Sequence, residues 1–139
     1  MIFHSKKDWW MTLIIFGTVA MSIAAIIPLF FVELNVGTII TTFVIGLTVW
    51  LVLAIYFKTY YSVEEEVVRV VSGPFRWKIP INEITSIRQT KSILSSPALS
   101  MDRLEVKYGR YQYIIISPED KHGFANEIVK RNSKVQVNL

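Results

Sequence analysis

The residues best suited to chemistry lie in one polar stretch at positions 92–103. It combines four serines with a proline and an aspartate–arginine pair. On a long loop, hydroxyl and guanidinium groups can bind a polar ligand. The same residues also suit a plain connection, in which serines cap turns and Asp102 pairs with Arg103. Both interpretations stay open, and the candidate ligand contacts are Ser95, Ser96, Ser100 and Arg103, with Arg76 and Lys78 on an earlier strand.

Nothing in the chain predicts a reaction. The sequence has no nucleophile elbow, phosphate-binding loop, dinucleotide fingerprint or zinc-protease motif. The two histidines, His4 and His122, have no obvious metal-ligand partners near them in the sequence. Cysteine is absent, which excludes disulfides and thiolate metal sites. We therefore expect a non-enzymatic protein without a cofactor.

Two long apolar segments must position these residues. Residues 9–32 and 34–57 contain no charged side chain, and only Glu33 separates them. As a helix, each segment would be about 36 Å long, enough to cross a hydrocarbon core of about 30 Å. A signal peptide has a shorter apolar core of about 7–15 residues. The sequence predicts a transmembrane hairpin over residues 1–57, with spans at about 9–32 and 35–57.

The charges predict the orientation of this hairpin. Lysines flank the spans on the two terminal sides, whereas the turn at Glu33 carries no positive charge. The positive-inside rule then places both termini in the cytoplasm of a multi-pass protein of the cell membrane. Aromatic residues next to these lysines are typical of membrane interfaces. The expected interface anchors are Lys6, Lys7, Trp9, Trp10, Tyr56, Lys58 and Tyr60.

The remaining charges indicate a partner class. The net charge is +4, but the lysines and arginines are dispersed and a Glu64–Glu65–Glu66 run interrupts them. This pattern favours attraction to anionic lipid over binding of nucleic acid. Within the spans, small residues such as Gly17 and Gly46 allow close helix packing, either within the hairpin or in a homo-oligomer.

After residue 58 the apolar period changes to two. We expect antiparallel strands at residues 59–63, 67–72, 75–79, 85–90, 102–108 and 111–117. Phe75, Trp77 and Ile79 are expected to face the core, with Arg76 and Lys78 outward. Ser117 is expected to cap a C-terminal helix that begins with Pro118. The sequence thus predicts a cytoplasmic domain at 58–132 and a flexible tail at 133–139.

Four stretches carry a resemblance to a known family. They resemble the YyaB-like family of bacterial PH-domain membrane proteins, which has no established reaction or ligand, and distantly the sublancin immunity protein type. The resemblance implies an α+β membrane protein whose PH-like, bent antiparallel sheet is capped by a C-terminal helix, with a seventh strand in residues 91–100. The stretches are 3–10 (FHSKKDWW), 79–84 (IPINEI), 94–109 (LSSPALSMDRLEVKYG) and 116–120 (ISPED).

From these features we expect a membrane-anchored PH-like module that binds a peptide or protein at the membrane surface. Its most concrete form is an immunity protein that intercepts a membrane-active bacteriocin. The alternative is a structural or regulatory subunit of a larger membrane complex. Phosphoinositide-binding PH domains carry basic residues in the first hairpin turn, whereas the turn at residues 64–66 is acidic and would repel such headgroups.

Overall fold

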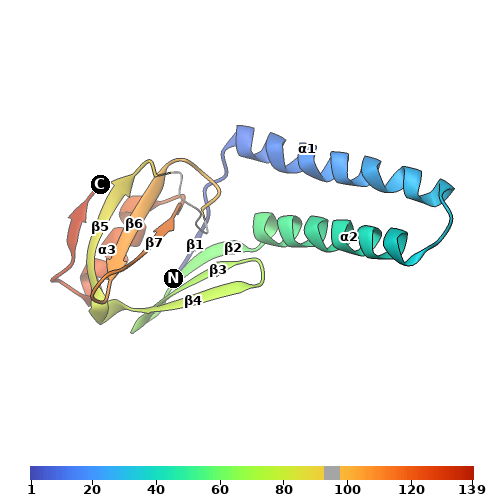
Figure 1. Cartoon of the computed structure of the whole chain (residues 1–139). Helices are drawn as coiled ribbons and strands as arrows, with labels where there is room; N and C mark the ends of the chain where they lie inside the picture. Colours follow the sequence, from blue (N-terminus) through green and yellow to red (C-terminus); the bar gives the residue numbers. More distant parts are fainter. Residues whose placement is uncertain (93–97) are drawn as a thin grey trace.

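A computed structural model describes residues 1–92 and 98–139. A pair of long helices projects from one end of a domain made of two sheets and a short helix (Figure 1). The order of elements confirms the α+β class expected from the sequence. The helices are α1 (Trp9–Ile26), the 3-10 helices η1 (Ile27–Phe31) and η2 (Ile81–Glu83), α2 (Val36–Phe57) and α3 (Lys121–Arg131).

The projecting helices are long and apolar enough to cross a membrane. The segments Trp9–Phe31 and Val36–Phe57 have 23 and 22 residues, and both have a mean hydropathy of 2.4. None of the most apolar stretch of either helix is buried within the protein. Asn35 begins α2 with a capping box, because its side chain accepts from the Thr38 backbone N–H at 3.0 Å while Thr38 Oγ1 accepts from the Asn35 backbone N–H.

The domain contains two four-stranded sheets. The first sheet has the order β1-β2-β3-β4 and the second β7-β6-β5-β8. Strands β2 to β7 match the six that the period-two pattern predicts, within two residues at each end. The bounds are β1 (Ile2–His4), β2 (Thr59–Val63), β3 (Val67–Ser72), β4 (Phe75–Pro80), β5 (Ile84–Thr90), β6 (Arg103–Tyr108), β7 (Gln112–Ile116) and β8 (Gln136–Asn138).

Strand β1 corrects the expected domain boundary. It pairs antiparallel with β2, with Phe3 opposite Tyr61, so the first residues belong to the sheet. The helical hairpin is therefore inserted between the first two strands of the domain (Figure 1). The acidic turn at residues 64–66 joins β2 to β3.

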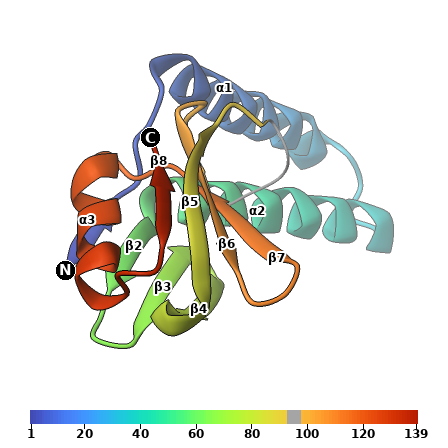
Figure 2. The same cartoon turned by 90° about the vertical axis from the view of Figure 1, so that its left-hand side faces the viewer.

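The C-terminal residues also differ from expectation. Residues 136–138 form β8, which runs parallel to β5 and pairs Val137 with Ile87. The tail predicted to be flexible thus completes the second sheet beside α3 (Figure 2). No described residue of the 91–100 segment is in a strand, so the strands beyond the expected six are the terminal ones.

Helix α3 begins later than predicted. Its N-cap is Asp120, whose carboxylate accepts from the Gly123 backbone N–H at 2.8 Å. Ser117 is instead fully buried, and its hydroxyl lies 3.0 Å from Ser5 Oγ and accepts from the Leu99 backbone N–H at 3.1 Å. The predicted cap was wrong because tertiary contacts engage this serine.

The core lies between the sheets and under α3. Its largest fully buried side chains include Tyr61 and Phe124, which meet edge to face. The Tyr61 hydroxyl donates to Ser5 Oγ and accepts from the Ser117 backbone N–H, each at 3.1 Å. Burial raises the pKa of Tyr61, so this hydroxyl stays protonated. All of residues 114–116 are buried, so β7 is covered on both faces.

Candidate binding surface

Two of the predicted ligand contacts lie side by side on the outer face of the first sheet. Arg76 is opposite Val71 and Lys78 is opposite Arg69, and both predicted contacts are exposed. Arg69 is paired with Glu64 at 2.7 Å, whereas Arg76 and Lys78 have no hydrogen-bond or ion-pair partner within the described part of the chain. These three basic side chains form a strip that attracts acidic groups.

The opposite face of β4 does not have the expected burial. Ile79 is buried as predicted, but Trp77 is 36% exposed and Phe75 50% exposed. The strand alternation is right, since all three side chains share a face. The β3–β4 hairpin, however, extends beyond the second sheet toward α2 (Figure 1). Phe75 and Trp77 therefore stand as an exposed aromatic pair, with ring centroids 6.1 Å apart.

Two other predicted contacts are buried in a hydrogen-bonded cluster that joins Asp8, at the start of α1, to Ser100 and Arg103 in and next to the loop before β6. We call this cluster the clamp. Ser100 is fully buried, and its hydroxyl donates to Asp8 Oδ1 at 2.9 Å. Arg103 is 5% exposed and donates to the Ser100 carbonyl at 2.6 Å and the Ser92 carbonyl at 2.8 Å. These groups serve the structure of the loop and leave the outer strip as the accessible part of the predicted site. Ser95 and Ser96 lie outside the described residues.

Asp102 also belongs to this clamp, with partners that the sequence did not suggest. Its carboxylate pairs with Lys121 at 2.5 Å and Lys6 at 3.0 Å. The hydrogen bond from Lys121, supported by that from Lys6, lowers the pKa of Asp102 to about 2. The clamp thus ties the N-terminal segment to the loop before β6 and to the start of α3.

The predicted interface anchors gather where the helices meet the domain. The ammonium of Lys7 lies 4.3 Å from the centre of the Tyr56 ring, a cation–π contact. Tyr56 is itself buried, packed edge to face on Phe16 with its hydroxyl 3.1 Å from Thr12 Oγ1. It therefore joins the two helices. The remaining anchors are Lys6, Trp9, Lys58 and Tyr60, which are exposed, and Trp10, which is partly exposed.

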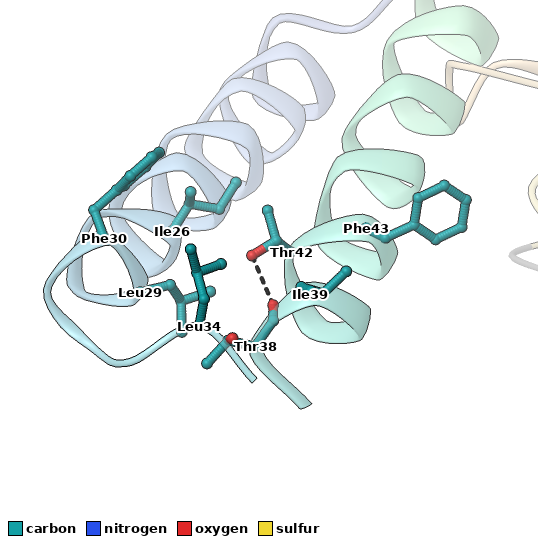
Figure 3. A pocket seen from close by; sticks show the side chains of 8 residues that line it. All are labelled: Ile26, Leu29, Phe30, Leu34, Thr38, Ile39, Thr42 and Phe43. Atoms are coloured by element: carbon teal, nitrogen blue, oxygen red, sulfur yellow. Dashed lines mark hydrogen bonds between the residues drawn. The ribbon is translucent and has the colours of Figure 1, made fainter. Parts of the chain in front are cut away.

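An apolar recess separates the helices near their connecting turn. It has a volume of about 400 Å³, and Figure 3 shows side chains from both helices around it. The Thr42 hydroxyl donates to the Thr38 carbonyl at 2.9 Å, so its hydrogen bond is satisfied within the helix. A Cβ added to Gly17 or Gly46 would meet no atom within 4 Å, so these glycines do not pack the helices together. The lining is Ile26, Leu29, Phe30, Leu34, Thr38, Ile39, Thr42 and Phe43.

Ionisable groups suited to metal binding do not converge in the described ranges, where no cluster of three or more His, Asp or Glu side chains occurs. His4 and His122 are both exposed and lie on different elements. Exposed features suited to recognition include the basic strip of Arg69, Arg76 and Lys78, the aromatic pair and the recess.

Comparison with known proteins identifies the domain. A family model described as "Bacterial PH domain" matches residues 59–132, which is more than half of the chain. The match begins at β2 and ends one residue after α3, so it omits β1 and the apolar helices. Neither the curated proteins nor the solved structures contain a match to this chain.

Proposed function

This chain belongs to the family of bacterial PH domains, and from this premise we propose that it is a non-enzymatic binding module anchored in the cell membrane. The observation that carries the proposal is the exposure of the two helices. Their most apolar stretches are entirely unburied within the protein, although both ends of the hairpin join a folded domain. Apolar surface of this extent needs a cover, and a bilayer supplies one along the whole length of a helix.

The polar side chains of the helices suit hydrocarbon surroundings. The hydroxyls of Thr18, Thr41 and Thr48 each donate to a backbone carbonyl one turn earlier, at 2.8–2.9 Å. A hydroxyl that is hydrogen-bonded in this way costs little free energy when it is placed in hydrocarbon. The lysines near the helices lie at the domain end, whereas Glu33 alone is at the other, which favours a cytoplasmic domain.

The recognition surface that we propose is the basic strip of Arg69, Arg76 and Lys78. Two of its side chains have no partner among the described residues, and the hairpin that carries them lies beside the end of α2 (Figure 1). Such a strip favours a peptide or protein that presents acidic groups near the membrane. Bacteriocin immunity is the narrower form of this proposal, and resemblance alone suggested it.

Membrane extraction tests the anchor. We expect the full chain expressed in a bacterium to stay in the membrane pellet after washing at alkaline pH and to enter solution only with detergent. Release by the alkaline wash would overturn the anchor. A helix variant with Leu47→Lys and Val44→Lys serves as the comparison, because two charges at mid-span oppose insertion.

A resistance assay tests the immunity form. Full-length protein should raise the resistance of a sensitive strain to a peptide encoded beside its gene. Resistance should disappear in Arg76→Ala/Lys78→Ala. It should persist in Lys107→Ala/Arg110→Ala, which removes two exposed charges on or next to β6, in the other sheet. Absence of resistance to any such peptide would end the immunity form and leave the general binding module.

The recess between the helices supports a second candidate function, that of a subunit in a larger membrane complex. The apolar recess has a volume of about 400 Å³, and a Cβ at Gly17 or Gly46, elsewhere on the same helices, would meet no described atom within 4 Å. Both features suit contact with a transmembrane helix of a partner. Bulky substitutions Gly17→Leu and Gly46→Leu should then release the chain from a complex isolated in mild detergent. Unchanged migration of both variants on a native gel would oppose this candidate.

A further inference from the structure

The β3–β4 turn is fixed against the last turn of α2. The Gly73 backbone N–H donates to the Lys58 carbonyl at 3.1 Å, and a Cβ on Gly73 would lie only 2.9 Å from Ile55 N. Thr59 adds a second connection, since its hydroxyl donates to the Ile55 carbonyl at 2.5 Å and lies 3.2 Å from Ser72 Oγ. The height of the turn along α2 is therefore set by backbone contacts.

This contact fixes the depth of the turn if α2 spans a bilayer, so the inference rests on the proposed function. With 22 residues, α2 is about 33 Å long, close to the hydrocarbon thickness of about 30 Å. Ile55, in its last turn, then lies at the inner boundary of the hydrocarbon. Pro74 and Phe75 lie at the same level, and Trp77 is about 7 Å further along the strand, within the headgroup layer.

The side chains at this level have the chemistry of the membrane interface. Phe75 and Trp77 are both exposed, and the second sheet does not extend over them. An indole ring combines an apolar face with one N–H donor, which suits the boundary between acyl chains and headgroups. We propose that Pro74, Phe75 and Trp77 form a third membrane contact, in addition to the two spanning helices α1 and α2. This contact inserts into the headgroup layer and fixes the tilt of the domain on the bilayer.

The third contact determines how a ligand reaches the basic strip. Arg76 alternates with Phe75 and Trp77 and projects from the other face of β4. With the aromatic pair among the headgroups, the Arg76 guanidinium is held beside the bilayer surface. A ligand adsorbed on the membrane then meets the strip directly.

Depth-dependent fluorescence quenching tests the third contact. The chain has no cysteine, so one introduced cysteine can carry an environment-sensitive dye in the full-length protein. The probes are spin-labelled lipids with the quencher either in the headgroup or deep in the acyl chain. The labelled variants are Phe75→Cys, Leu47→Cys at mid-span and Tyr111→Cys, which is 88% exposed on the turn between β6 and β7.

We expect loss of Phe75→Cys emission with the headgroup quencher, loss of Leu47→Cys emission with the deep quencher, and unchanged Tyr111→Cys emission. If Leu47→Cys is quenched and Phe75→Cys is not, the third contact is wrong and the anchor stands. If Leu47→Cys is not quenched, the anchor itself fails. Shielding of the Phe75→Cys dye from both lipid and aqueous iodide would assign the aromatic pair to a protein surface, which also overturns the proposal.

Discussion

Asp8 is hydrogen-bonded to Met101 in the loop before β6. The Asp8 Oδ2 atom accepts a hydrogen bond from the Met101 backbone N–H at 2.8 Å. The other carboxylate oxygen accepts from Ser100 Oγ at 2.9 Å. Asp8 is also the N-cap of α1, but its side chain makes no capping hydrogen bond. The residue before the first apolar helix therefore uses its charge to join that helix to the domain.

The first prediction concerns this joint. Asp8→Ala removes two charge-assisted hydrogen bonds and should lower the free energy of unfolding by about 2 kcal/mol. Thermal unfolding of the full chain in detergent micelles measures the loss. Glu65→Ala is the matched control, because Glu65 is an exposed acid on the turn between β2 and β3. Equal melting of the two variants would contradict a joint at Asp8.

The second prediction is an acid-dependent loss of stability from Asp102. Lys121 and Lys6 hold its pKa at about 2 in the folded state, below the ordinary 3.8. The unfolded state therefore takes up the proton first, and the contribution is complete above about pH 4 and lost as the pH falls through 2. It amounts to at most about 2 kcal/mol.

Unfolding of Asp102→Asn against pH measures this contribution. The difference in stability between wild type and Asp102→Asn should be larger at pH 6 than at pH 2. A difference that stays constant over this range would show that the ion pairs with Lys6 and Lys121 are not its source.

The third prediction compares two glycines with the same backbone conformation. Gly73 and Gly109 both have a φ of +58°, so alanine at either position costs about 1 kcal/mol of backbone strain. At Gly73 the new Cβ also meets Ile55 N at 2.9 Å, whereas at Gly109 the nearest atom is 3.7 Å away. Gly73→Ala should therefore destabilise the chain by clearly more than Gly109→Ala does. Similar melting temperatures would mean that the turn moves freely against α2.

The fourth prediction separates the two candidate caps of α3. Asp120→Ala removes the cap on Gly123 and should cost about 1 kcal/mol, whereas Asp120→Asn keeps an acceptor oxygen and should cost less. Ser117→Ala should destabilise through another cause, since it leaves the buried Leu99 N–H without its partner. Amide exchange distinguishes them: Asp120→Ala should accelerate exchange in the first turn of α3, and Ser117→Ala at Leu99. The reverse pattern would restore Ser117 as the cap.

Local periodicity predicted most of the fold. The alternation of apolar and polar residues identifies β2 to β7. Each of these strands pairs with the strand next to it in the sequence, so the pattern and its pairing partner lie close together along the chain. It missed β1 and β8, which have three residues each and pair with strands far away along the chain. Alternation also assigned Phe75 to the correct face of β4, but it cannot show how far the opposing sheet extends.

The site was predictable only in part. The sequence predicts the outward position of Arg76 and Lys78 correctly, because polar residues that alternate with apolar ones point outward from a sheet. The sequence pattern of Ser100 and Arg103 is also that of ligand contacts. Their partners in the structure are Asp8 for Ser100 and the carbonyls of Ser92 and Ser100 for Arg103, and folding brings Asp8 close from the far N-terminus. A polar loop residue that binds a ligand and one that ties two segments together look the same in sequence.

The measurement that tests the anchor and its orientation most directly is labelling of single cysteines in intact cells. Asn35→Cys lies at the turn between the helices, and Ser133→Cys is exposed on the domain after α3. An impermeant thiol reagent should label Asn35→Cys in intact cells and Ser133→Cys only after the cells are opened. Labelling of Ser133→Cys but not Asn35→Cys in intact cells would contradict a domain held at the cytoplasmic surface.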